Sequence, residues 1–241
     1  MISNSTGGSG LPNVSVDGPA GAGKTTVARS FAREVGFRHI DSGAMYRAVT
    51  LNALEDGRWD VTGSDEGILV FLARNLDVTF DAGAGGVQRV LLGGIDRTED
   101  LRSKAVEEAV SLVASSAEVR LALMDRQREL AQSGGVVMDG RDIGSHVLTG
   151  AGLKVYLTAA LPVRIARRLV QRRQKGIAIT WEDAASSVIN RDRIDSTRAV
   201  APLKPAPDAI LIDSTHLTRC DVVRQMKFML RDRLNEDRGG E

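Results

Sequence analysis

The amino-acid sequence predicts an α/β fold with a doubly wound parallel sheet as its core. Mostly apolar runs at 136–138, 153–159 and 208–214 are typical of parallel strands that helices cover on both faces. A strand, a Gly-rich loop and a helix follow one another at 13–36, and helical patterns separate the later runs. This alternation is characteristic of doubly wound sheets, whose ligands bind at the carboxyl ends of the strands.

Length and composition limit the architecture and the class of partner. With 241 residues the chain is long enough for one α/β domain with insertions and short for two independent domains. The 32 basic and 31 acidic residues nearly balance, so no global field favours nucleic acid. The single cysteine, Cys220, excludes an internal disulfide and a cysteine-ligated zinc site, which fits a reducing compartment. We expect it at least half-buried on a late helix.

The amino-terminal stretch MISNSTGGSG has neither a basic flank nor an apolar run. It therefore differs from a signal peptide and from an amphipathic anchor, and we expect a disordered tail over 1–12. No window approaches 18 consecutive apolar residues, so we expect a soluble protein that does not bind a membrane. The rest, 13–238, is predicted to form a single domain.

The first element, at 13–36, contains the pattern G-x-x-x-x-G-K-[ST]. Val14 and Val16 predict a short buried strand, and the apolar spacing from Thr26 predicts a helix. Phosphate oxygens approach a backbone closely only where side chains are missing, and glycines allow the dihedral angles required. The residues predicted to bind the nucleotide are Gly18, Pro19, Ala20, Gly21, Ala22, Gly23, Lys24, Thr25 and Thr26.

This loop indicates a nucleoside triphosphate. Backbone N–H groups and the amino terminus of the following helix point at the β-phosphate. Lys24 bridges β and γ oxygens, and the Thr25 hydroxyl can ligate Mg²⁺. The strand-loop-helix context separates this motif from an ordinary Gly-rich turn.

The next segments predict an extended piece at 37–40 and a helix that Asp41 or Ser42 caps. Residues 76–94 alternate apolar and polar around a Gly-rich turn, as an antiparallel hairpin does, and we expect an insertion beside the parallel core. Residues 101–133 predict two helices with a break near 115–116.

Acidic residues end three predicted strands, namely Asp17, Asp139 and Asp213, and should lie near the ligand-binding edge. Two basic segments, 164–176 and 190–203, separate the last two strands. A run of charges is usually a solvated helix face, and that alternative stays open for each arginine of the first segment. The other possibility is that they converge on a cleft in which two anionic substrates meet.

The arginines distinguish among the functions that a phosphate loop supports. The sequence shows neither the N-K-x-D guanine motif nor the D-x-x-G turn of a GTP switch, and a motor would be much longer. Several separate segments instead carry arginine. Phosphoryl transfer consists mostly of positioning and charge stabilisation, so this distribution favours an enzyme that brings an acceptor phosphate against a γ-phosphate. The arginines concerned are Arg47, Arg120, Arg141, Arg191 and Arg198.

Four motifs, GPAGAGKTT, DSGAMYRAVT, DGRDIG and RDRIDSTRAVAPLKPAPDAILIDST, occur in the order and spacing of bacterial cytidylate kinases. From about 14 to about 230 the chain resembles this family of P-loop nucleoside monophosphate kinases. The resemblance implies transfer from ATP, with Mg²⁺, to CMP or dCMP, giving ADP and CDP or dCDP. It also implies a helical lid at about 164–200, an NMP-binding insertion at about 60–100, and a cytoplasmic monomer of pyrimidine metabolism acting on small molecules.

The resemblance also assigns residues. Asp139 matches the strand-end acid that holds Mg²⁺ through water, with a structural cap as the alternative. Lys24, Arg141 and Arg198 are the expected catalytic residues. A carboxylate at Asp142 accepts from the cytosine amino group and repels the uracil carbonyl, so it would select the base. The residues that match CMP contacts are Ser42, Arg47, Ser111, Arg120, Arg141, Asp142, Arg191, Asp195 and Arg198.

Some points stay open from the sequence. Ser111 has a solvent-facing helix serine as its alternative, and the role of Arg193 is not assigned. A kinase of another small acceptor, such as UMP or shikimate, would keep the loop and lose the preference carried by Asp142. A regulatory module that binds ATP without transfer is the alternative from another class, but it has no need of acceptor-side arginines.

Overall fold

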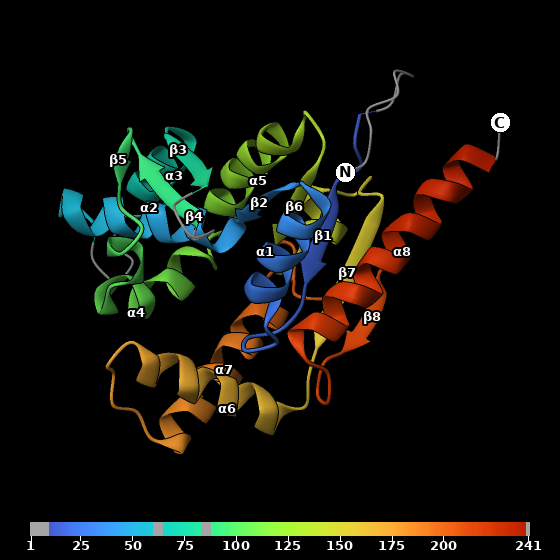
Figure 1. Ribbon diagram of the computed structural model, residues 1–241. Helices are drawn as coiled ribbons and strands as arrows, with labels where there is room; N and C mark the ends of the chain where they lie inside the picture. The colour runs from blue at the N-terminus through green and yellow to red at the C-terminus, as the bar shows by residue number, and fades with distance from the viewer. Residues whose placement is uncertain (1–9, 60–64, 83–87, 240–241) are drawn as a thin grey trace. The chain divides into compact units, whose positions relative to one another are not determined.

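The computed structural model describes residues 10–59, 65–82 and 88–239 (Figure 1). The chain divides into two compact units. The core unit comprises Met1–His39 and Ala131–Glu241, and the insert unit comprises Ile40–Leu130. The predicted tail falls largely on residues 1–9, which lie outside the described residues.

The main sheet has five strands in the order β2 (Arg38–Asp41), β6 (Val136–Asp139), β1 (Val14–Asp17), β7 (Leu153–Thr158) and β8 (Ile210–Asp213). β1 runs parallel to both β6 and β7, and β7 runs parallel to β8. All four residues of β1 and of β6 are buried, as expected for strands covered on both faces. The predicted doubly wound parallel sheet is confirmed.

Two helices pack on the central strands of the core unit. α1 (Lys24–Val35) and α8 (Arg219–Gly239) contact each other and lie along the same face of the sheet (Figure 1). The apolar side chains of both helices share one hydrophobic cluster with β1 and β7. Since α1 starts directly after the Gly-rich loop, this packing fixes the loop between a buried strand and a buried helix.

Two predictions about the core unit were wrong. We expected the run at 208–214 to be covered on both faces, but β8 is an edge strand and Leu211 is 64% exposed. We expected Cys220 to be at least half-buried, but it is exposed on α8. An edge strand and an amphipathic helix each leave one face to solvent, so the apolar character of a residue does not settle its burial.

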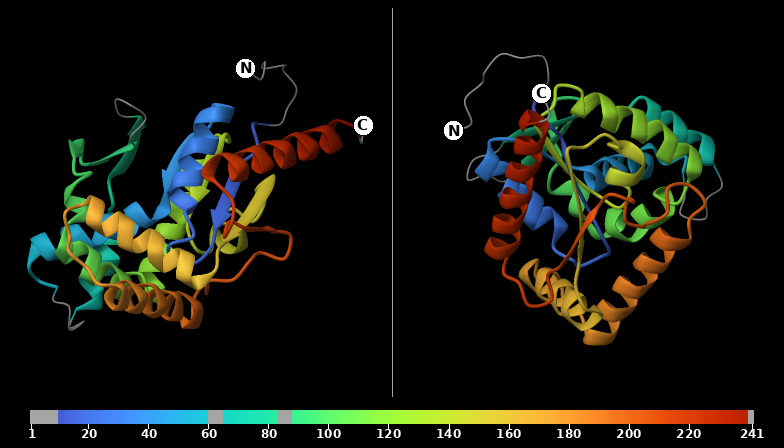
Figure 2. Two further views of the ribbon diagram at one scale, coloured as in Figure 1. Left: turned by 60° about the horizontal axis from the view of Figure 1, so that its bottom comes forward. Right: turned by 90° about the vertical axis from the view of Figure 1, so that its right-hand side faces the viewer.

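The basic segments predicted between the last two strands form a helical pair. α6 (Leu161–Gln174) and α7 (Trp181–Thr197) pack on each other in both views of Figure 2. Ile165, Ala184 and Val188 form their small apolar core. Thr180 and Asp183 make a capping box that starts α7, which fixes where the second helix begins. A short π-helix, η3 (Ile143–Val147), follows β6.

The insert unit contains the predicted antiparallel hairpin. β3 (Val78–Ala82) pairs with β4 (Gln88–Leu92), and β5 (Ile95–Asp96) adds a third strand. The Gly-rich turn predicted between the two strands falls on residues 83–87, which lie outside the described residues. The helical elements are α2 (Ser42–Asp56), α3 (Glu66–Arg74), η2 (Asp100–Arg102), α4 (Lys104–Val113) and α5 (Ala117–Ala131), so the predicted break near 115–116 is confirmed.

The predicted side-chain cap of α2 is wrong. Asp41 occupies the N-cap position but its side chain makes no capping hydrogen bond, and Ser42 is the first helical residue rather than the cap. Asp41 instead accepts from Arg47 Nη2 at 2.6 Å. A charged partner one and a half turns along the helix outcompetes the backbone N–H groups for this carboxylate.

None of the helices within the described residues has the length and apolarity needed to span a bilayer.

Candidate active site

The Gly-rich loop, residues 18–23, joins the end of β1 to the start of α1. Gly18 and Gly21 have φ angles of 148° and 74°, in the region that favours glycine. A Cβ at Gly18 would lie 2.0 Å from the Leu157 carbonyl oxygen, and one at Gly21 would lie 2.6 Å from the Arg164 carbonyl oxygen. Both conformation and space therefore require glycine where the loop presses against β7 and α6.

Lys24 is buried at the first position of α1, with its Nζ donating to the Pro19 carbonyl oxygen at 2.8 Å. Burial, and then the charge of Arg141, lower the pKa of Lys24 well below its usual value, while Asp139 and Asp195 act in the opposite direction. An anion in the loop would favour the ammonium form. The position suits a lysine that holds phosphate.

Thr25 and Asp139 lie together beside the loop. The Thr25 hydroxyl donates to Asp139 Oδ2 at 2.6 Å, and His39 Nε2 lies 2.7 Å from Asp139 Oδ1. Sequence patterns indicated Thr25 and Asp139 but not His39. The contact of His39 depends on the order of strands, because β2 lies next to β6 and brings His39 level with the end of that strand.

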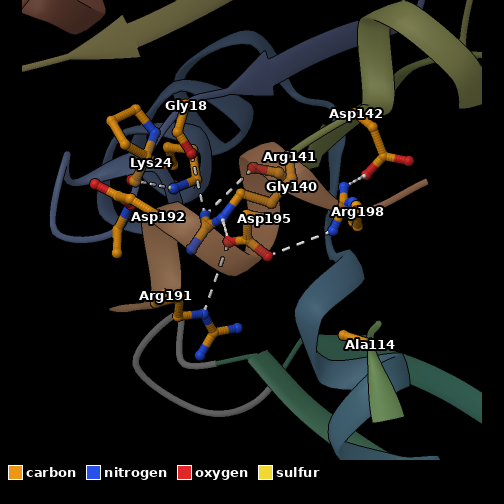
Figure 3. Close-up of polar contacts among 12 residues, drawn as sticks. Gly18, Lys24, Ala114, Gly140, Arg141, Asp142, Arg191, Asp192, Asp195 and Arg198 are labelled. Atoms are coloured by element: carbon orange, nitrogen blue, oxygen red, sulfur yellow. Dashed lines mark hydrogen bonds and ion pairs between the residues drawn. The ribbon is translucent and has the colours of Figure 1, made fainter. Parts of the chain in front are cut away.

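Arginines and carboxylates form a connected network next to the loop (Figure 3). Arg141 donates through Nε to Asp195 Oδ2 at 2.7 Å and through Nη1 to the Gly18 carbonyl oxygen at 3.1 Å. Arg198 donates to Asp142 Oδ1 at 3.0 Å and to Asp195 Oδ1 at 3.4 Å. Arg191 Nε lies 3.9 Å from Asp195 Oδ2, so these two residues form an ion pair. The segment between β6 and η3 (Arg141 and Asp142), α7 with its C-cap Arg198, and the Gly-rich loop thus meet in one charged cluster.

The network is largely buried, and opposite charges attract more strongly away from water. The side chains of Arg198 and Asp142 are 3% and 7% exposed. Burial acts to raise the pKa of Asp195, but the charges of Arg141 and Arg191 outweigh it and hold that pKa below its usual value. Burial likewise acts to lower the pKa of Arg141, and the charge and hydrogen bond of Asp195 raise it instead. Asp195 and Arg141 therefore stay charged at neutral pH.

Asp17 ends β1 and supports the segment that carries Asp142. Its carboxylate accepts from the backbone N–H groups of Ile143 at 2.9 Å and of Gly144 at 2.7 Å. Burial raises the pKa of Asp17 to about 7, although both hydrogen bonds act to lower it. Asp213, the third predicted strand-end acid, is exposed and accepts from Thr215, so it forms a surface turn instead.

The other predicted site residues belong to the insert unit. Arg120 is 1% exposed, lies over the Tyr46 ring at 5.4 Å from its centroid, and donates to the Ala114 carbonyl oxygen at 3.4 Å. Arg47 pairs with Asp41. Ser42 is buried at the start of α2, and Ser111 is partly exposed on α4. Within this unit, Arg120 and Arg47 are both held in place on or against α2.

Within the core unit, the structure brings the predicted phosphate-binding residues next to the predicted acceptor-side residues, whereas Asp213 lies in a surface turn. Lys24 follows the loop at the start of α1, Thr25 and Asp139 lie beside it, and the charged network adjoins the loop through Arg141. This arrangement combines backbone amides for an anion with charged side chains that suit a second anion.

Comparison with known proteins gives consistent results. The family model described as cytidylate kinase matches residues 14–231. A cytidylate kinase of Pelotomaculum thermopropionicum is 46% identical over 216 residues, 90% of this chain and 94% of that protein. A cytidylate kinase of Bacillus licheniformis is 43% identical over 213 residues, 88% of this chain and 93% of that protein.

A solved structure of an uncharacterized protein from Eubacterium ventriosum matches with a TM-score of 0.50 at 9% identity, covering 92% of this chain and 99% of that one. At this identity the likeness concerns the fold alone.

Proposed function

The chain belongs to the cytidylate kinase family, and on that premise we propose how it transfers the γ-phosphate of ATP to CMP or dCMP, giving ADP and CDP or dCDP. The observation that carries the proposal is Arg141, which bonds both the Gly-rich loop and the acidic residue Asp195. One guanidinium thereby links a triphosphate site to the acceptor-side network.

On the donor side, the proposed nucleotide site is the loop from Gly18 to Thr26. Its amides and the start of α1 hold the β-phosphate, and Lys24 reaches the β and γ oxygens. The burial of Lys24 keeps water away from its charge, so its attraction to phosphate is stronger than it would be at the surface. This residue supplies screening charge rather than a proton.

On the acceptor side, Asp142 is proposed to accept from the cytosine amino group. Arg198 and Arg191 hold the acceptor phosphate, and Asp195 bonds a sugar hydroxyl. The backbone N–H groups of Ile143 and Gly144, the two residues after Asp142, donate to Asp17 and hold the segment that carries the base-reading carboxylate. In the insert unit, Ser42, Arg47, Ser111 and Arg120 are proposed as CMP-binding residues.

The transfer needs no general base, because the attacking phosphate oxygen is already anionic. The residues align that oxygen with the γ-phosphorus and reduce repulsion between the two anions. Lys24, Arg141 and Arg198 are proposed for this role. α6 and α7, with residues of about 164–200, form the proposed lid, whose closure would exclude water as a competing nucleophile.

Mg²⁺ is the proposed cofactor. The hydroxyl of Thr25 and the carboxylate of Asp139 are 2.6 Å apart beside the loop, and such oxygen donors fit a cation that prefers oxygen ligands. Within the described residues, no group of three or more His, Cys, Asp or Glu could hold a metal by itself. Magnesium in phosphoryl-transfer sites uses one or two protein ligands together with phosphates and water. When bound, it supplies positive charge to the phosphate oxygens.

We further propose that residues 13–238 act as one kinase domain with the NMP-binding insertion at about 60–100. The enzyme is proposed to act as a monomer in the cytoplasm, in pyrimidine nucleotide metabolism, on small molecules rather than on nucleic acid or membrane. The near balance of 32 basic and 31 acidic residues supports the exclusion of nucleic acid.

The test is a coupled ADP-release assay with ATP and Mg²⁺ that offers CMP, dCMP, UMP, AMP and GMP separately. Turnover confined to CMP and dCMP is the expected result. Equal turnover with UMP would contradict the role of Asp142, and absence of turnover with all five would point to a different acceptor or to binding without transfer.

A further inference from the structure

Two arginines of α6 bond the backbone of the Gly-rich loop. Arg164 donates through Nη1 to the Ala20 carbonyl oxygen at 3.1 Å, and Arg167 donates through Nη1 to the Ala22 carbonyl oxygen at 3.1 Å. The two arginines are three residues apart, so they lie on one face of the helix. The two carbonyl groups that they bond, those of Ala20 and Ala22, have one residue of the loop between them.

Each bonded carbonyl belongs to a peptide whose N–H is on a glycine. The peptide plane is rigid and trans, so its C=O and N–H point in opposite directions. A guanidinium that holds the Ala20 C=O therefore directs the Gly21 N–H away from α6, and the same holds for Ala22 and the Gly23 N–H. Within the described residues neither amide has a hydrogen-bond acceptor.

The neighbouring peptide of the loop shows the same geometry with both ends occupied. The Pro19 carbonyl oxygen accepts from Lys24 at 2.8 Å, and the N–H of Ala20, in the same peptide, donates to Asp192 Oδ1 at 2.8 Å. Asp192 is itself paired with Arg164. Both backbone polar groups of Ala20 are thus held by a pair of charged side chains from α6 and α7.

A restraint of this kind is needed because glycine restricts its peptides so little. Gly21 and Gly23 have φ angles of 74° and 93°, and a chain with two such residues can rotate the peptides between them at low cost. An unrestrained loop would sample orientations in which its amides miss the anion, which lowers affinity by the fraction of time spent in them.

Arg167 is anchored more extensively than a contact with one carbonyl requires. It also donates to Ser214 Oγ at 3.0 Å and to the Ser214 carbonyl oxygen at 2.8 Å. Ser214 directly follows β8 and is buried, and its Oγ donates to the Thr158 carbonyl oxygen at 2.9 Å. The main sheet therefore holds the guanidinium that holds the loop.

We propose that Arg164 and Arg167 are positioning residues that aim the amides of Gly21 and Gly23 at the β-phosphate of the nucleotide. The inference rests on the proposed function, because it takes the loop as the nucleotide site. It gives two arginines of the predicted lid segment a role that differs from screening the γ-phosphate. A guanidinium that contacts the γ-phosphate affects ATP alone, whereas a directed amide at the β-phosphate affects ADP and ATP equally.

The test is isothermal titration of Arg167→Met with ADP, ATP and CMP, each without Mg²⁺. We expect the affinities for ADP and ATP to fall by the same factor, about tenfold for the loss of the charged hydrogen bond that holds the Ala22 carbonyl oxygen, with CMP affinity unchanged. The control is Arg224→Met on α8, whose side chain is 79% exposed and pairs with Asp221. It loses the same charge and should bind as the wild type does.

The outcomes separate the alternatives. Loss for ATP alone would identify a γ-phosphate contact and overturn the inference, as would wild-type affinity for both nucleotides. Equal loss for all three ligands would indicate general loosening of the fold and also overturn it. If the wild type binds neither nucleotide, the proposed function fails and the inference with it.

A second variant covers the case in which Arg167→Met does not fold. Ser214→Ala changes no charge. It removes one acceptor of Arg167 and the bonds from Ser214 Oγ to the Thr158 and Ala22 carbonyl oxygens. We expect a smaller loss that is again equal for ADP and ATP, with CMP affinity unchanged. Loss for ATP alone, or wild-type affinity for both nucleotides, would contradict the inference.

Discussion

Asp17 should make the stability of this protein decrease as pH rises from 5 to 8. Burial raises the pKa of its carboxyl group in the folded protein to about 7, from a reference value of 3.8. Between these values the unfolded chain releases its proton and the folded chain retains it, so a rise in pH favours unfolding. Below pH 3.8 Asp17 is protonated in both the folded and the unfolded protein. Once the pH passes about 7, it is ionised in both, and the free energy of unfolding falls no further on its account.

The expected magnitude follows from the width of this interval. From pH 5 to pH 7 the unfolded state gains about 1.36 kcal/mol per pH unit, so Asp17 alone should lower the free energy of unfolding by about 2–3 kcal/mol between pH 5 and pH 8. Asp17→Asn keeps the shape of the side chain and cannot ionise. The difference in unfolding free energy between the wild type and this variant should change by that amount across the range.

The assay is equilibrium urea unfolding of both proteins at pH 5, 6, 7 and 8. Asp213→Asn is the matched control, because Asp213 also ends a strand but is exposed, and its bonds with Thr215 lower the pKa of its carboxyl group. Its difference from the wild type should stay constant over the same range. A difference for Asp17→Asn that is equally independent of pH would refute the reasoning from burial.

Three further predictions concern the reaction. Lys24→Ala should abolish transfer, a loss of at least about 10³-fold in kcat, with thermal unfolding near that of the wild type; a normal rate would remove the loop from the mechanism. Asp142→Asn should lower the ratio of kcat/KM for CMP over UMP by about 10–100-fold, because the acceptor that selects the cytosine amino group is weakened, and an unchanged ratio would place base selection elsewhere. Asp139→Asn should raise the Mg²⁺ concentration for half-maximal rate by about tenfold or more, measured at saturating ATP, whereas an unchanged requirement would make this residue purely structural.

Sequence patterns predicted two kinds of strand: those buried on both faces, and those in which buried and exposed residues alternate. β1, β6 and β7 are short apolar runs, and β3 and β4 alternate apolar and polar residues, so periodicity was sufficient to predict these strands. β8 was assigned as a strand correctly but placed wrongly in the sheet, because its place at the edge depends on strand order and not on its own residues. Local chemistry likewise suggested Asp41 as a cap, while its actual partner is a side chain.

The candidate site divides in the same way. A motif indicates Lys24, Thr25 and Asp139, since the loop and the strand end bring them together in any parallel sheet of this kind. Pairing of individual guanidinium groups with individual carboxylates depends on the exact orientation of η3 and α7, which spacing along the chain does not contain. The contact of His39 with Asp139 and the bonds from α6 to the loop carbonyls belong to this second class.

The network of Arg141, Asp195, Arg198 and Asp142 has a consequence for how new acceptor preferences can arise. Each of its members bonds at least one other, and Arg198 and Asp142 are almost fully buried. Arg198 and Asp142 pair with each other at 3.0 Å in the interior, so replacing either one by a neutral residue removes a charged partner of the other and lowers the stability of the fold. Homologues and designed variants that accept another base should therefore differ at Asp142 and Arg198 together, and a library that varies these positions one at a time will contain destabilised members.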